Sequence, residues 1–104
     1  MVISFSVPEA RNQLLNDGEV FTYRWKKRKN VGNNWANSGR GTKKIGDVWI
    51  CEYFQAEPNL SLAPYQHKSG FKSLEDWQQR IQDMKPRNQD DPGWLYHVIL
   101  YPKE

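Results

Sequence analysis

Positively charged and aromatic side chains are concentrated in residues 23–44. This stretch holds eight of the fifteen lysines and arginines and none of the twelve carboxylates. Lysine and arginine neutralise phosphates, and tryptophan stacks on unpaired bases with about 1 to 3 kcal/mol per base. The pattern predicts a site for RNA or a nucleotide. The predicted phosphate contacts are Lys26, Lys27, Arg28, Lys29, Arg40, Lys43 and Lys44, and the predicted stacking residues are Trp25 and Trp35.

Thr22 directly precedes this stretch and Arg24 lies at its start, both within a segment of strand composition. Side chains two residues apart in a strand point to the same face. Arg24 can hold a phosphate or carboxylate with two parallel hydrogen bonds, and Thr22 can hydrogen-bond a base edge. We therefore expect both side chains to contact the bound group. The alternative is that Arg24 only pairs with a surface carboxylate, which contributes little.

The remaining titratable residues do not form a motif for catalysis or metal binding. His67 and His97 have no cysteine, histidine or acid at ligand spacing, so neither a metal nor a cofactor is expected. Glu52 has two interpretations: an acid or base whose pKa is raised by apolar neighbours, or a residue at the rim of the sheet. His67 is a second candidate for the edge of a cleft. The catalytic residues, if the protein is an enzyme, are unknown at this level.

Length and composition indicate one domain, spanning residues 1–104, with a net charge of +3. Cys51 is the single cysteine, so an internal disulfide is excluded and an oxidising compartment is not implied. No apolar stretch approaches the roughly 18 residues of a membrane span, and no signal peptide is recognisable. These features predict a cytoplasmic protein without a membrane partner, and they leave the oligomeric state open.

Local signals predict the elements that position these residues. Pro8 suits the first turn of a helix, and Gly18 ends that helix because glycine readily adopts the left-handed conformation. Ser73 is a natural N-cap for a second helix, and Pro86 stops it. Strands are predicted at residues 2–7, 20–25, 48–54 and 94–101.

Residues 26–46 keep no helical or strand period and are rich in glycine and asparagine, which predicts a long basic loop. The periodic positions of Trp49, Trp77 and Trp94 predict core residues. The order of elements is strand, helix, strand, loop, strand, helix, strand. A small α+β domain follows, with a strongly curved, mostly antiparallel, barrel-like sheet and two flanking helices.

Three motifs occur in a fixed order: NDGEVFTYR at residues 16–24, KIGDV at 44–48 and SGFKSLEDW at 69–77. With a helix after the first strand and the short length, they resemble the ASCH domains of the PUA-like superfamily over nearly the whole chain. The resemblance implies a small PUA-like β-barrel flanked by helices. It also implies a cleft beside the barrel and a link to RNA or modified nucleosides.

Some ASCH domains hydrolyse the acetyl group of N4-acetylcytidine with a lysine, a threonine and a glutamate. Thr22, two residues before Arg24, matches the threonine. The lysine position falls near Glu19 or Val20, and neither of these is a lysine. The glutamate position falls at His67, Lys68 and Ser69, and none of these is a glutamate. The resemblance therefore implies an RNA- or nucleotide-binding module, with hydrolysis of a modified nucleoside or of RNA as the alternative. A third hypothesis is a protein-interaction domain whose basic loop meets an acidic partner.

Overall fold

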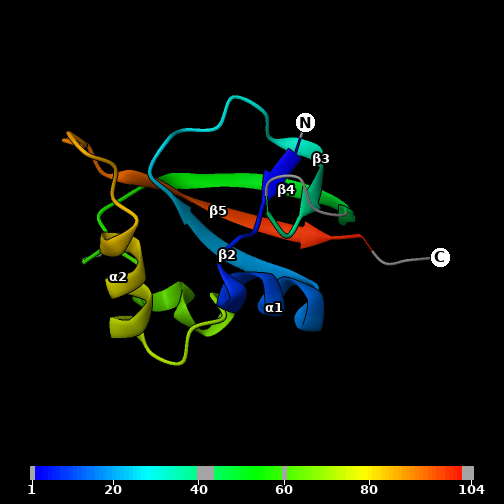
Figure 1. Ribbon diagram of the computed structural model, residues 1–104, viewed down its shortest axis with the longest axis horizontal. Coiled ribbons are helices and arrows are strands. Elements are labelled where there is room, and N and C mark those ends of the chain that lie inside the picture. Colours follow the sequence, from blue (N-terminus) through cyan, green and yellow to red (C-terminus); the bar gives the residue numbers. More distant parts are fainter. Residues whose placement is uncertain (1, 40–43, 60, 102–104) are drawn as a thin grey trace.

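A curled sheet forms the body of the protein (Figure 1). The computed structural model describes residues 2–39, 44–59 and 61–101, and within them the sheet has five strands. The elements in chain order are β1 (Val2–Ser4), α1 (Pro8–Asp17), β2 (Glu19–Arg24), β3 (Gly32–Asn37), β4 (Lys44–Ala56), the 3-10 helix η1 (Ala63–Lys68), α2 (Leu74–Asp83) and β5 (Gly93–Leu100).

The sheet order is β1-β3-β4-β5-β2, so β1 and β2 are its two edges. β1 is parallel to β3, and the other neighbouring strands are antiparallel. The sheet curls until its edges are bridged by side chains: Arg24 Nη2 donates to the carbonyl oxygen of Ser4 at 2.9 Å, and Arg28 Nη2 donates to that of Val2 at 3.2 Å. The predicted α+β class and the curved, mostly antiparallel sheet are confirmed as a half-barrel.

Two clusters of buried side chains pack on opposite faces of the sheet. Val20 belongs to the first cluster and its neighbour Phe21 to the second, as expected for adjacent residues of a strand. The first cluster also takes Leu14 from α1, and the second takes Trp77 and Ile81 from α2. In Figure 1, α1 lies below β2 and α2 lies below the left end of the sheet, so each helix meets a different cluster. The helices therefore cover apolar side chains that the sheet alone would leave exposed.

Local signals fix the helix ends as predicted. Gly18 has a φ of 80° and donates its N–H to the carbonyl oxygen of Leu14, which closes α1. The Ser73 hydroxyl accepts a hydrogen bond from the Asp76 N–H at 3.1 Å, which caps α2. Pro8 occupies the first turn of α1, where no backbone donor is needed.

The prediction of a continuous loop at residues 26–46 is wrong, because β3 lies inside it and β4 begins at Lys44. The sequence of β3, GNNWAN, has low strand propensity. Pairing on both sides overrides that propensity: β3 bonds β1 through Val2 to Ser4 and β4 through Lys44 to Ile50. The basic stretch is thus divided, and the connection from β2 to β3 is residues 25–31.

The sheet also corrects the expectation for Trp49 and decides between the two interpretations of Glu52. Trp77 is buried and Trp94 is partly buried, but Trp49 is 39% exposed and does not belong to the core. Glu52 is exposed beside a β-bulge that shifts the register between Glu52 and Phe54, so it is not enclosed by apolar neighbours. None of the helices within the described ranges is long and apolar enough to cross a membrane.

Candidate binding pocket between the edge strands

A pocket of about 410 Å³ opens beside the gap between β1 and β2. Its volume lies in the range of roughly 300 to 1,000 Å³ that small-molecule sites occupy. Most of its lining comes from residues 4–7, 21–24 of β2, 25–28 and the C-terminal half of α2, and the rest comes from Ala10, Ser69, Phe71, Met84 and Pro86. Its aromatic lining residues are Phe5, Phe21, Tyr23, Trp25, Phe71 and Trp77.

Hydrogen bonds hold two of these rings in place. The Tyr23 hydroxyl donates to the carbonyl oxygen of Ala56 at 2.8 Å and accepts from the Gly93 N–H at 2.6 Å. The Trp25 indole donates to the carbonyl oxygen of Ile81 at 2.9 Å. Tyr23 therefore joins β2 to the end of β4 and the start of β5, and Trp25 joins the end of β2 to α2. These hydrogen bonds within the protein hold the two aromatic rings of the pocket wall in place without a ligand.

Arg24 is the principal charged group of the pocket wall. Its Nε donates to the hydroxyl of Thr22 at 3.2 Å, its Nη2 donates to Ser4, and its Cζ lies 5.1 Å from the centre of the Phe5 ring. Burial, and then the charge of Arg28, lower the pKa of Arg24 to about 10, so the group is still positive at neutral pH. No carboxylate among the described residues forms an ion pair with it.

Thr22 is 7% exposed and lies on the same face of β2 as Arg24, as predicted. Its oxygen accepts the Arg24 hydrogen bond, and an arginine cannot remove a proton from it. Within residues 2–39, 44–59 and 61–101, no histidine, lysine or carboxylate hydrogen-bonds the Thr22 hydroxyl. The surroundings of Thr22 therefore suit binding better than nucleophilic attack.

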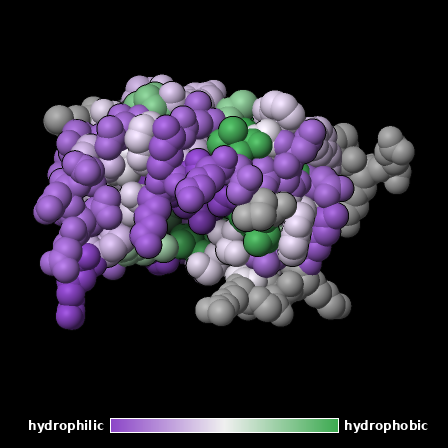
Figure 2. Space-filling model, turned by 90° about the horizontal axis from the view of Figure 1, so that it is seen from above, coloured by the Kyte–Doolittle hydropathy of each residue, from purple (hydrophilic) through white to green (hydrophobic). Residues whose placement is uncertain are grey.

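Basic residues 26–28 form the outer lip of the pocket, hereafter the basic lip. Lys26 and Lys27 are exposed, and the Lys27 ammonium lies 4.7 Å from the centre of the Trp94 ring. The Arg28 N–H donates to the Tyr96 hydroxyl at 2.6 Å, which anchors the lip to β5. The connection from β2 to β3 runs along the top of Figure 1, and the face seen from above in Figure 2 is mainly hydrophilic.

The remaining predicted site residues lie away from this pocket or beyond the described ranges. Lys29 is exposed and does not line it. Lys44 pairs with Asp47 at 2.8 Å in β4, and Trp35 on β3 lines a separate, shallow hollow. Arg40 and Lys43 lie outside the described residues. The structure brings together Thr22, Arg24, Trp25, Lys26, Lys27 and Arg28.

Sequence reasoning missed the contribution of α2 and of the segment before it. Arg80 and Phe71 line the pocket, and Arg80 also pairs with Glu9 of α1 at 3.5 Å. Gly70 lets this segment approach α1, because an added Cβ would lie 2.1 Å from the carbonyl oxygen of Glu9. The SGFKSLEDW motif marked the segment, but only tertiary packing shows that it faces β2.

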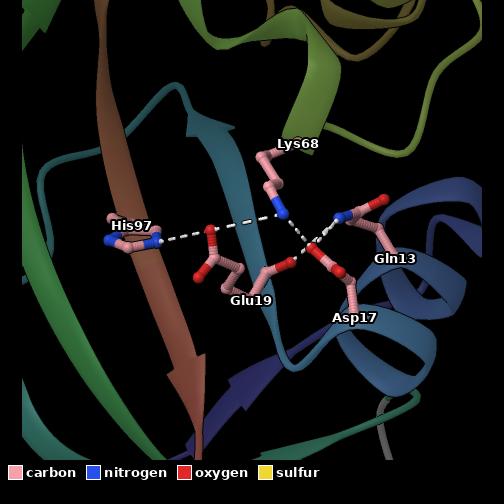
Figure 3. Close-up of polar contacts among 5 residues, drawn as sticks. All are labelled: Gln13, Asp17, Glu19, Lys68 and His97. Carbon is pink, nitrogen blue, oxygen red and sulfur yellow. Dashed lines mark hydrogen bonds and ion pairs between the residues drawn. The ribbon is translucent and has the colours of Figure 1, made fainter.

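A second polar cluster lies at the junction of α1, β2 and η1 (Figure 3). The Lys68 ammonium lies between Asp17 and Glu19, at 2.5 and 3.8 Å from their carboxylate oxygens. The hydrogen bond between Lys68 and Asp17 raises the pKa of Lys68 and lowers the pKa of Asp17. These contacts tie η1 to the end of α1, which is a structural role. His67, on the same 3-10 helix, is exposed and does not line the pocket.

His97 borders this cluster from β5. Its ring stacks on Phe21 with centroids 4.5 Å apart, and its Nε2 lies 3.8 Å from the nearer Glu19 oxygen. Burial lowers the pKa of His97, and the Lys68 charge acts in the same direction, while Glu19 opposes both. The side chain therefore packs as a neutral ring at neutral pH. No group of histidines, cysteines and acids in the described part of the chain has the arrangement of a metal site.

The site therefore combines an aromatic pocket, a half-buried arginine that lacks a carboxylate partner among the described residues, and exposed lysines at the opening. Such a site can bind a flat ring together with an acidic or acceptor-rich group. Comparison of the chain with protein-family models, with curated proteins and with solved structures gives no match.

Proposed function

We propose that the protein binds RNA or a nucleotide in the pocket between β1, β2 and α2. The observation that carries the proposal is Arg24, a half-buried cation on the pocket wall with no carboxylate partner among the residues described. Burying an unpaired charge costs free energy unless a partner offsets it. A ligand that accepts hydrogen bonds from Arg24 supplies that partner.

The other lining residues fit a nucleotide better than a simple anion. Aromatic rings line the same pocket as Arg24, and these suit the faces of an unpaired base. Lys26 and Lys27 at the opening suit phosphates that stay in contact with water. A single-stranded segment can place one base inside and its phosphates along the basic lip. This arrangement favours binding over the hydrolytic alternative, because Thr22 has the arginine as its hydrogen-bond partner.

We further propose that the half-barrel is an ASCH domain of the PUA-like superfamily. Two of the three motifs behind the resemblance contribute to the pocket: Thr22 and Arg24 from the first, and Ser69 and Phe71 from the third. The curled sheet with few helices is compatible with that assignment. A cytoplasmic location and a role on modified nucleosides stay predictions of the sequence.

Binding of a fluorescently labelled single-stranded RNA, followed by anisotropy at increasing salt, tests the function. We expect log affinity to fall linearly with log salt, because phosphate contacts release counterions. Polyglutamate of matched charge is the control, since it offers anions without bases. Equal or tighter binding of polyglutamate would favour the protein-interaction hypothesis and contradict a nucleotide site.

A further inference from the structure

The Arg24 guanidinium keeps hydrogen-bond donors that the protein does not use. A guanidinium has five N–H donors and no acceptor. One donor on Nε bonds Thr22, and one on Nη2 bonds Ser4. The two Nη1 hydrogens and the second Nη2 hydrogen have no hydrogen-bond partner among residues 2–39, 44–59 and 61–101. These free donors belong to neighbouring nitrogens, so they can serve two adjacent acceptors.

The contacts of Arg24 also fix the orientation of its free Nη donors. Thr22 holds Nε from within β2, Ser4 holds Nη2 from β1, and the Phe5 ring lies beside Cζ. A long side chain with three such contacts has little rotational freedom left. The loss of conformational entropy on binding is correspondingly small, and the donors are held ready for a planar partner.

The depth of the charges separates the two ends of a nucleotide. Lys26 and Lys27 are exposed at the opening, whereas Arg24 is half-buried on the wall beside the Phe5 ring. A nucleotide whose phosphate meets the lysines places its base against Arg24 and the aromatic rings. The partner of Arg24 is then a base edge, not a phosphate.

Among the bases, guanine offers the matching edge on its Hoogsteen side, where O6 and N7 are adjacent acceptors. Adenine has the same shape but replaces O6 by an amino donor, which would face the guanidinium. Resting on the proposed function, we infer that the pocket selects guanine over adenine through a bidentate contact from Arg24. The specificity-determining residue is Arg24, and Thr22 is a positioning residue that holds its Nε.

Base analogues in a constant host strand test this inference directly. The probes are short oligouridine strands with one central guest: guanine, adenine, hypoxanthine or 7-deazaguanine. We expect guanine to bind roughly 5- to 150-fold more tightly than adenine. Hypoxanthine, which keeps O6 and N7, should match guanine, and 7-deazaguanine, which lacks the N7 acceptor, should lose most of the preference.

Two variants test whether the Arg24 guanidinium causes the preference for guanine. Arg24→Met keeps a long unbranched side chain but removes every hydrogen-bond donor, so the ratio of guanine to adenine affinity should approach one. Thr22→Val keeps the shape of its side chain and should reduce the ratio without abolishing binding. Thermal unfolding of both variants checks that they fold. If a variant does not fold, the affinities of the unaltered protein for the base analogues still test the guanine preference.

The outcomes separate the two proposals. Equal affinity for guanine and adenine strands, or full affinity for 7-deazaguanine, overturns the guanine inference while leaving nucleic-acid binding intact. Failure of every strand to bind contradicts the proposed function itself.

Discussion

Arg24 of β2 donates a hydrogen bond to the carbonyl oxygen of Ser4 in β1, 2.9 Å away, across the open side of the half-barrel. The two strands are the edges of the sheet and have no backbone ladder between them. The same guanidinium lines the pocket. Closure of the sheet and recognition of the ligand therefore depend on one side chain, and substitutions at Arg24 must be judged by stability as well as by binding.

Neutralising the basic lip should weaken the salt dependence of RNA binding. The double variant Lys26→Gln/Lys27→Gln removes two exposed cations at the pocket opening. Each lost phosphate contact should lower the slope of log affinity against log salt by about 0.7 for a single strand. Anisotropy titrations at several salt concentrations measure this slope.

A charge-matched control accompanies that measurement. Lys44→Gln/Lys72→Gln changes the net charge equally, and neither residue lines the pocket. We expect its slope to stay near that of the unaltered protein. If both double variants lowered the slope equally, the contacts would be spread over the surface and the basic lip would have no special role.

Replacing Gly70 by alanine should destabilise the fold strongly. Gly70 has a φ of 91°, and an added Cβ would lie 2.1 Å from the carbonyl oxygen of Glu9, so α1 and the segment before α2 would have to separate. Gly18 is the matched control, with a φ of 80° and open space around its Cα. We expect a cost of about 1 to 2 kcal/mol for Gly18→Ala and more than about 3 kcal/mol for Gly70→Ala. Urea unfolding measures both, and equal costs would contradict the close approach.

Removing the Tyr23 hydroxyl should cost more than removing an exposed one. Tyr23→Phe leaves the Gly93 N–H and the Ala56 carbonyl without this partner in a partly buried place, at a cost of about 1 to 3 kcal/mol. Tyr101 is the control, because its hydroxyl donates to Asn33 at an exposed site. Chemical denaturation of both Phe variants decides this. A smaller loss of unfolding free energy for Tyr23→Phe than for Tyr101→Phe would show that the Tyr23 hydroxyl does not hold the strand ends together.

Protonation of His97 should weaken the fold at mildly acidic pH. Burial lowers its pKa in the folded protein, so the unfolded chain binds the proton more tightly. The stability is therefore fully present above the unfolded pKa of about 6.5 and decreases as pH falls through it toward the lower native value. Glu19 and Lys68 face the ring and act in opposite directions.

Urea midpoints between about pH 7.5 and 5.5 measure that decrease. We expect His97→Gln to flatten the profile over this range. His67→Gln is the matched control, because His67 is exposed. A profile that stays unchanged in His97→Gln would assign the pH dependence to other groups.

The helix ends were predictable because their signals are local. Pro8, Gly18 and Ser73 act through the backbone of their own turn, and all three do so in the structure. β3 was not predictable, because its glycine and asparagines become a strand only through pairing with β1 and β4. The exposure of Trp49 could not be predicted either, since periodicity gives the face of a strand but not whether a helix covers that face.

The candidate site was predicted in part for the same reason. Thr22 and Arg24 follow the alternation of a strand, and the adjoining lysines follow them in sequence, so these residues lie together. Trp35 and Lys44 were grouped with them on the assumption of one loop, and the intervening β3 carries them to another part of the sheet. Arg80 joins the pocket only through the packing of α2.

Nuclear magnetic resonance of the ¹⁵N-labelled protein during titration with single-stranded RNA tests the central claim most directly. Backbone, arginine and indole N–H signals report each part of the surface separately. We predict the largest shifts at Thr22, Arg24 and the Trp25 indole, with little change at Trp35 and Trp49. Shifts confined to Trp35 and Trp49, or no shifts with RNA in excess, would contradict a nucleotide site between β1 and β2.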